Sequence, residues 1–227
     1  RDSLMDDSEL NRDYVVMPIG ACIIATLGLL SNSAAVIIGA MLVAPLMLPI
    51  RAMAFGFLEG DIKLIKEGAK ALAVGTAIAI ALSVALGLML GLSEYGSEVW
   101  ARSKPTLLDL GIAITAGGIS GFAKVQPKIS NTLSGTAIAV ALMPPVCVIG
   151  LGLAQGKMAL SQGAALLYVT NLIGITLACM LAFWLTGYAP FQKARKSLNF
   201  VLAITAVLVV PLALSLIELV RQNRAED

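Results

Sequence analysis

The residue best placed to do chemistry in this sequence is Arg51. It lies two positions after Pro49, inside an apolar stretch that is long enough to cross a membrane. A charged side chain near the middle of a membrane helix costs roughly 2.5–3.5 kcal/mol on insertion scales, so Arg51 should be paired, hydrated or placed at an interface. Asp109 and Glu59 are its candidate partners. Two interpretations stay open: Arg51 serves a binding site, or its long side chain reaches the headgroup layer.

Four prolines in two apolar stretches are the next candidates. Pro45 and Pro49 lie in one stretch, and Pro144 and Pro145 lie in the other. Proline removes a backbone donor and clashes with the preceding turn, so each stretch is predicted to contain an interrupted helix. The ends of such half-helices can face a central cavity and offer N–H groups to an anion or a polar group. The alternative is a packing kink whose free carbonyls are satisfied by neighbouring helices.

Small and polar residues complete the candidate site. Asn131 lies at the end of an apolar stretch, where it can line a solute path or cap a helix. Gly117 and Gly118 fall in a glycine-rich segment that permits close approach of helices, within one subunit or between the subunits of a homo-oligomer. The predicted substrate-binding residues are Pro49, Arg51, Gly117, Gly118, Asn131, Pro144 and Pro145.

Most other kinds of chemistry have no support in the sequence. There is no histidine, which removes the most common general base and metal ligand. The three cysteines, Cys22, Cys147 and Cys179, stand singly in apolar runs, as small core residues do. We predict no catalytic residue, no metal and no cofactor, and we do not expect an enzyme. The net charge of +2 is too small to indicate nucleic acid as a partner.

Composition sets the class of protein. Hydrophobic residues make up 58% of the chain and charged residues 13%, whereas a soluble domain carries about a quarter charged residues. The apolar runs reach the roughly 20 residues that a membrane helix needs. The sequence therefore predicts an all-α, polytopic membrane protein in contact with the lipid bilayer. Its seven predicted spans cover residues 14–31, 34–58, 69–92, 106–125, 132–154, 159–186 and 198–220.

One pattern occurs twice in the chain. Residues 39–60 align without a gap with residues 135–156, so that Pro49 matches Pro145 and Gly60 matches Gly156. Each copy contains the interrupted span of a three-span unit, and an odd number of spans makes the second unit enter the membrane from the opposite side. We therefore predict two inverted repeats, 14–92 and 106–186, with helices two and five broken at prolines and one extra helix at 198–220. The alternative is a chance likeness between two apolar helices.

The distribution of lysine and arginine predicts the orientation. With the N-terminus inside, ten of these residues fall in inner segments and five in outer ones, leaving out Arg51. We therefore expect a cytoplasmic N-terminal segment over 1–13, a transmembrane domain over 14–221 and a C-terminal tail over 222–227. The expected location is the inner (plasma) membrane of the cell.

Two motifs resemble a known family. They are Gly-Ala-Met-Leu-Val-Ala-Pro-Leu-Met-Leu-Pro-Ile at 39–50 and Gly-Thr-Ala-Ile-Ala-Val-Ala-Leu-Met-Pro-Pro-Val at 135–146. Together they are similar to an uncharacterised hydrophobic domain family, domain of unknown function 389, over about residues 14–190. The resemblance implies a multi-span prokaryotic inner-membrane protein, often with a soluble N-terminal region. It implies no substrate and no site residues.

Interrupted helices at matching positions in two halves are typical of transporters. We expect a secondary transporter or permease-like protein with a mid-membrane site between spans two and five. Arg51 and the half-helix N-termini favour an anionic or polar organic solute, and the scarcity of acidic residues deep in the spans disfavours a cation or proton site. The alternative is a non-transporting membrane anchor or signalling module for an upstream soluble domain, with a dry interior.

Overall fold

The protein is built of helices. The computed structural model describes residues 2–6, 10, 12–91, 94–125, 142–188, 203, 205–207, 209 and 210. Within these residues the elements are all helical, which confirms the predicted fold class at this level. They are α1 (Asp2–Asp6), α2 (Arg12–Leu30), α3 (Ala34–Val43), α4 (Met47–Glu59), α5 (Ile62–Leu90), α6 (Ser97–Ala101), α7 (Leu107–Val125), α9 (Met143–Ala154) and α10 (Met158–Leu185).

Several of these helices are long and apolar enough to cross a membrane. α5, α7 and α10 meet that requirement alone, and α3 and α4 meet it together as a pair bent by 54°. α2 and α9 are apolar but shorter over Tyr14–Leu30 and Met143–Ala154. The described part of the chain thus contains three such helices, or four with the bent pair. The count of seven stays a prediction, since the seventh span lies mostly, and the tail at 222–227 wholly, outside the described residues.

The helix bounds follow the predicted spans with three differences. α5 begins at Ile62 and absorbs the lysine-bearing run before the third span, because Asp61 caps it by accepting from the N–H groups of Lys63 and Leu64 at 3.1 and 3.2 Å. The loop predicted at 93–105 contains the short helix α6. The N-terminal segment contains α1, whose Leu4 side chain is fully buried.

α4 turns into α5, and α9 turns into α10, through the same local structure. Gly60 and Gly156 end the two half-helices with φ of +71° and +67°, the left-handed region that glycine adopts without penalty. The N–H of the residue that follows bonds back to the carbonyl of Gly56 in one hairpin (2.9 Å) and of Gly152 in the other (2.8 Å). Each half-helix therefore ends in a tight reversal and packs against the long helix that comes next.

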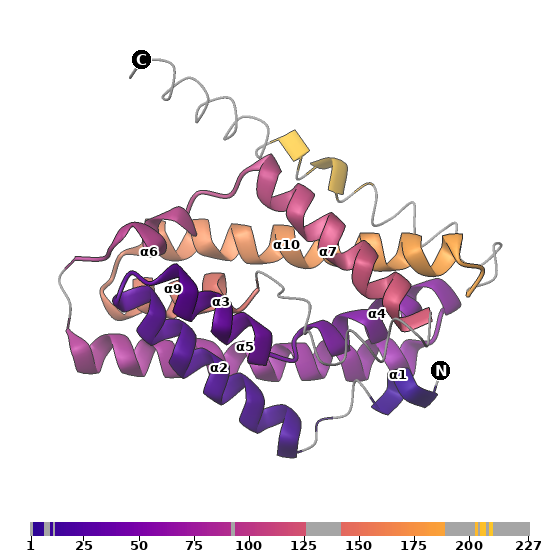
Figure 1. The fold of residues 1–227 in the computed structure, drawn as a ribbon, viewed down its shortest axis with the longest axis horizontal. Helices are drawn as coiled ribbons and strands as arrows, with labels where there is room; N and C mark the ends of the chain where they lie inside the picture. Colours follow the sequence, from indigo (N-terminus) through magenta and orange to yellow (C-terminus); the bar gives the residue numbers. More distant parts are fainter. Residues whose placement is uncertain are drawn as a thin grey trace.

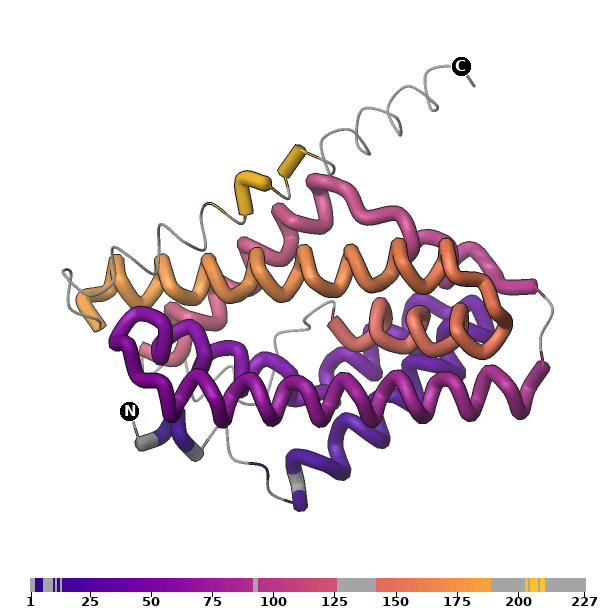
Figure 2. Tube along the Cα trace, turned by 180° about the vertical axis from the view of Figure 1, so that it is seen from behind, coloured from indigo at the N-terminus to yellow at the C-terminus, as the bar shows by residue number. Residues whose placement is uncertain are grey.

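Two long helices frame the molecule. α5 and α10 extend along its length and run in opposite directions (Figure 1). α4 and α9 lie toward opposite ends, and each packs against both long helices (Figures 1 and 2). α7 packs along α10, while α2 packs against α3, α5 and α9. The core lies between α4, α5, α9 and α10, and α2 and α3 contribute buried residues to it.

The segment before α7 is fastened to both halves of the chain. Asn32, in the turn between α2 and α3, accepts from the backbone N–H of Glu98 at 2.9 Å and from the hydroxyl of Ser97 at 3.2 Å, which caps α6. The hydroxyl of Tyr95 donates to the carbonyl of Leu151 on α9 at 2.7 Å. The side chain of Asn32 therefore serves α6 and not α3, the helix that follows it in the chain.

Glycines bring helices together inside one chain. A Cβ added at Gly117 would lie 2.5 Å from the carbonyl oxygen of Ile175 on α10, and one at Gly87 would lie 2.8 Å from the Cβ of Ala154 on α9. Neither contact leaves room for a side chain. Gly117 therefore serves packing within the subunit, the first of the two uses expected for it, and Gly87 does the same.

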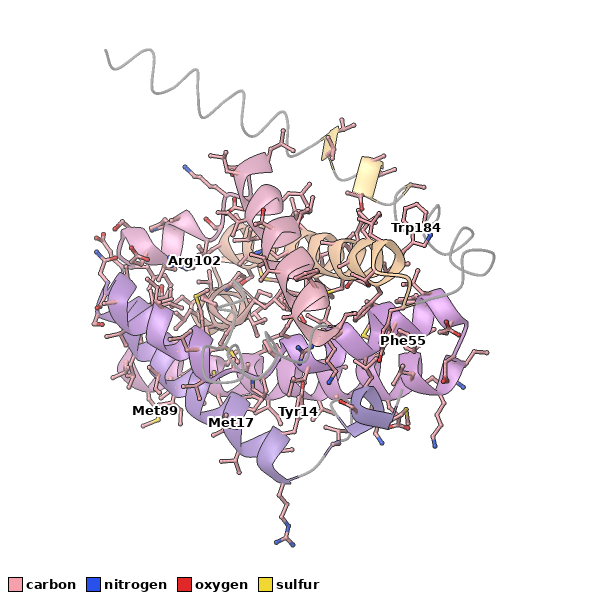
Figure 3. All side chains as sticks on the ribbon, turned by 45° about the vertical axis from the view of Figure 1, so that its right-hand side comes forward. Tyr14, Met17, Phe55, Met89, Arg102 and Trp184 are labelled. Carbon is pink, nitrogen blue, oxygen red and sulfur yellow. The ribbon has the colours of Figure 1, made fainter. Side chains whose placement is uncertain are left out.

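Large apolar side chains lie on the outside as well as in the core. Met89 is 81% exposed, Leu88 is 65% exposed and Ile112 is 61% exposed. Met89 and Met17 lie at the periphery of the bundle (Figure 3). Soluble monomers rarely expose large contiguous apolar areas. The apolar exterior and the long apolar helices together fit a membrane protein.

Candidate functional site

The first half of the candidate site is the break between α3 and α4. Ala44 has an extended backbone, with φ of −72° and ψ of 118°, as expected for the residue before a proline. The helix therefore stops at Val43 and resumes at Met47. Pro49 is buried in the first turn of α4, where its missing N–H removes no helical hydrogen bond. The interruption predicted for residues 34–58 is present, and Pro45 accounts for it.

The second half of the candidate site is the start of α9. Pro144 and Pro145 are buried in its first turn. Leu142 and Leu46, which precede α9 and α4, make no side-chain hydrogen bond to the first turns. The cap residue of each half-helix thus supplies no side-chain acceptor to the first turn. Residues 126–141 lie outside the described part of the chain, and with them lie Asn131 and the stretch in which the second break is predicted.

Arg51 lies on the side of α4 that faces α10. Its side chain is half-buried, and its guanidinium is close enough to act electrostatically on the buried thiol of Cys179 on α10. The Sγ of Cys179 donates to the carbonyl of Gly117 on α7 at 3.1 Å. Arg51 and Gly117, two of the predicted site residues, therefore both lie on the side of their helices toward Cys179.

Gly118 and Asp109 have different surroundings. A Cβ added at Gly118 would have no heavy atom within 4 Å, in contrast to its neighbour Gly117. The Asp109 carboxylate accepts from both the N–H and the hydroxyl of Thr106 at 2.8 Å. This is a capping interaction at the start of α7. The structure thus assigns Asp109, a candidate partner of Arg51, a role at a helix end.

A cluster of three hydroxyls, absent from the sequence-based predictions, joins α2, α5 and α10. Thr76 Oγ1 and Tyr168 Oη lie 2.7 Å apart and share a hydrogen bond. Tyr14 Oη donates to the carbonyl of Ala71 at 3.0 Å, and Tyr168 is close enough to Tyr14 to act on it electrostatically. We call Tyr14, Thr76 and Tyr168 the central hydroxyl cluster.

The central hydroxyl cluster lies beside the break. A Cβ added at Gly75 would be 3.3 Å from Tyr14 Oη and 3.4 Å from Cδ2 of Leu46, which stands between α3 and α4. Gly75 therefore lets both side chains approach the middle of α5. Tyr168 precedes Cys179 by eleven residues on α10, which corresponds to about 16 Å along the helix axis. The cluster and Arg51 thus mark two separate polar positions along α10.

The fold and this arrangement define an all-helical protein with apolar helices of membrane-spanning length, built around two half-helices that begin at prolines. The chain belongs to the family described as a domain of unknown function (DUF389), whose sequence model matches residues 41–177. The match runs from the end of α3 into α10, so it includes both half-helices. The predicted family membership is confirmed.

One curated relative is an uncharacterized protein of Methanocaldococcus jannaschii. It is 28% identical over 191 residues, an alignment that covers 84% of this chain and 59% of the relative. The chain therefore spans about three fifths of the length of that protein. No solved structure matches the chain.

Proposed function

We propose that this protein is a secondary transporter or permease-like membrane protein with a mid-membrane site between α4 and α9. The observation that carries the proposal is the pair of half-helices. α4 and α9 have prolines in their first turns, begin inside the molecule and end in glycine turns at opposite ends of it (Figure 1). Interrupted helices form solute sites in transporters, because the helix dipole gives their N-termini partial positive charge.

The same proposal includes an inverted repeat, which the positions of the helices support. α4 and α9 begin at Met47 and Met143, and α5 and α10 begin at Ile62 and Met158, so both pairs keep the 96-residue offset of the sequence pattern. The starts of α1 and α6, and those of α2 and α7, are 95 residues apart. α5 and α10 run in opposite directions, which is also clear from behind (Figure 2). Inverted repeats place the solute site at the interface of the two units, here between α4 and α9.

The polar groups near this interface favour an anionic or polar organic solute. Arg51 contributes a positive charge from α4, and its burial gives that charge more effect than it would have in water. The central hydroxyl cluster contributes groups that both donate and accept hydrogen bonds. A solute with one anionic group and further oxygen atoms would use both positions. The protein would act in the inner membrane, with its N-terminus in the cytoplasm.

The test is whether water-borne reagents reach the starts of α4 and α9. Met47→Cys and Met143→Cys, each in a chain with Cys22, Cys147 and Cys179 changed to Ser, should react with a small charged thiol reagent in vesicles. Leu64→Cys and Leu160→Cys are matched controls, because they are as buried as Met47 and Met143 but lie at equivalent places in the two hairpins, away from the starts of the half-helices. The controls should stay unmodified. An interior in which none of the four positions reacts would favour the membrane anchor or signalling module instead.

A further inference from the structure

Two of the three cysteines meet in the interior. Cys22 on α2 and Cys147 on α9 have their Sγ atoms 3.7 Å apart, and both side chains are fully buried thiols. Cys22 Sγ also donates to the carbonyl of Ala79 on α5 at 3.2 Å. The two residues are 125 positions apart in the chain, so the packing of α2 on α9 alone brings them together.

This separation is close to what a disulfide requires. The sulfurs of a disulfide are about 2.03–2.05 Å apart, and these two thiols already touch. Joining them requires the two sulfurs to approach further, by movement of the side chains or of α2 against α9. Cys179 lies elsewhere, on α10, where its Sγ donates to the carbonyl of Gly117. The chain thus contains two thiols in contact and a third buried, free cysteine apart from them.

Cys22 points into the bundle, but the residues that follow it on α2 reach the apolar exterior. Ile23 and Ile24, which follow Cys22, are 38% and 39% exposed on the apolar exterior. In a bilayer this face of α2 would contact lipid. An oxidant that dissolves in lipid can therefore concentrate on the outside of the helix that carries Cys22, whereas a charged oxidant in water does not.

We propose that Cys22 and Cys147 form a site of reversible oxidative modification, at which a lipid-soluble two-electron oxidant such as a quinone closes a disulfide between α2 and α9. Two S–H bonds break and one S–S bond forms. The two protons and two electrons pass to the quinone, which becomes a quinol. A dithiol reductant reverses the reaction by thiol–disulfide exchange.

The consequence of this disulfide rests on the proposed transport function. α2 belongs to the first unit of the repeat and α9 to the second, so the bond would tie the two units together. Cys147 also stands 96 positions after Arg51, at the equivalent place on the second half-helix. The disulfide would therefore hold the start of α9 in one position and stop movement between the units.

The experiment treats the full chain in lipid vesicles with a fully substituted short-chain quinone, which cannot add directly to thiols. The protein is then unfolded, capped with a maleimide and weighed by intact mass spectrometry. The number of free thiols should fall from three to one, with the loss of two hydrogen atoms, and dithiothreitol should restore all three. Retention of three thiols after treatment would overturn the proposal.

Single substitutions identify the partners. Cys179→Ser should still lose both of its remaining thiols, whereas Cys22→Ala and Cys147→Ala should each keep two free thiols. Thiol loss in Cys147→Ala, or a disulfide that links two chains, would contradict the assignment. This result is independent of transport: the thiol count reports the disulfide, and the labelling of positions 47 and 143 reports the solute site.

Discussion

Neighbouring glycines on α7 allow a direct comparison at the level of one residue. Gly117→Ala would place a Cβ 2.5 Å from the carbonyl oxygen of Ile175, so α7 and α10 would have to separate. Overpacking of this kind costs about 1–3 kcal/mol. Gly118→Ala meets no atom within 4 Å and should be neutral or slightly stabilising, because alanine is the better helix former by about 0.8–1.0 kcal/mol. Thermal unfolding in detergent measures both, and equal midpoints would contradict the described packing of α7 on α10.

Arg51 has a specific expected role in solute binding. Arg51→Gln removes the positive charge but keeps most of the side chain's length. The glutamine amide still offers N–H donors in place of the guanidinium. We expect this variant to be expressed and assembled normally but to lose uptake in reconstituted vesicles supplied with a panel of radiolabelled small carboxylates, phosphate and neutral polar solutes. Arg51→Lys, the charge-keeping control, should retain part of the uptake. Unchanged uptake in Arg51→Gln would assign the guanidinium to the headgroup layer.

The hydrogen bond between Thr76 and Tyr168 joins the two long helices across the repeat. Thr76→Val leaves the phenol without this partner, and Tyr168→Phe leaves the threonine hydroxyl without it. Each change should cost about 0.5–1.5 kcal/mol, and the double variant should cost less than the sum, because the second change removes nothing further. The unfolding free energies of the unchanged protein, the two single variants and the double variant give the coupling free energy between the two hydroxyls. Strict additivity would mean that the two hydroxyls do not interact.

The sequence alone indicates some residues of the candidate site but not others. Arg51 and the prolines stand out because a charge and helix breakers are rare inside apolar runs. Tyr14, Thr76 and Tyr168 do not stand out, because each alone is ordinary in a membrane helix. Their significance comes from contacts between residues as many as 92 positions apart, and hydrophobic spacing carries no information about such pairs.

At the level of helices, the apolar runs located the elements well. α2, α7 and α10 begin within two residues of the predicted spans, because the length of an apolar run fixes where a membrane helix can lie. α1 and α6 were missed. Each is only five residues long and is positioned by partners elsewhere, such as the side chain of Asn32. Tertiary contacts of that kind cannot be read from local composition.

The starts of α5 and α10 allow a test of the inverted repeat. Ile62 and Met158 occupy equivalent positions and are 65% and 58% exposed. In a chain without other cysteines, Ile62→Cys should react with a membrane-impermeant maleimide from the cytoplasmic side only, and Met158→Cys from the opposite side only. An inverted repeat requires this opposition, because its second unit enters from the other face. Reaction of both from one side would exclude the repeat.

For the whole molecule, the sequence predicted two similar halves but not how they interlock. α9 of the second half packs on α2 and α5 of the first, and α4 of the first packs on α10 of the second. Neither half therefore has a complete core of its own. The pattern of apolar residues cannot distinguish two halves that pack against each other in this way from two halves that each pack alone. Both arrangements bury the same side chains.

The cap that Asn32 provides for α6 has a consequence for biosynthesis. The turn that carries Asn32 is made early, but the groups that it binds, on Ser97 and Glu98, arrive only after α5 is complete. Residues 1–91 must therefore wait in the membrane with unfinished contacts, exposed to quality-control proteases. We expect fragments 1–91 and 94–227 to be short-lived when produced separately and to co-purify when produced together. A fragment 1–91 that lasts as long as the intact chain would show that the first half matures before the second is made.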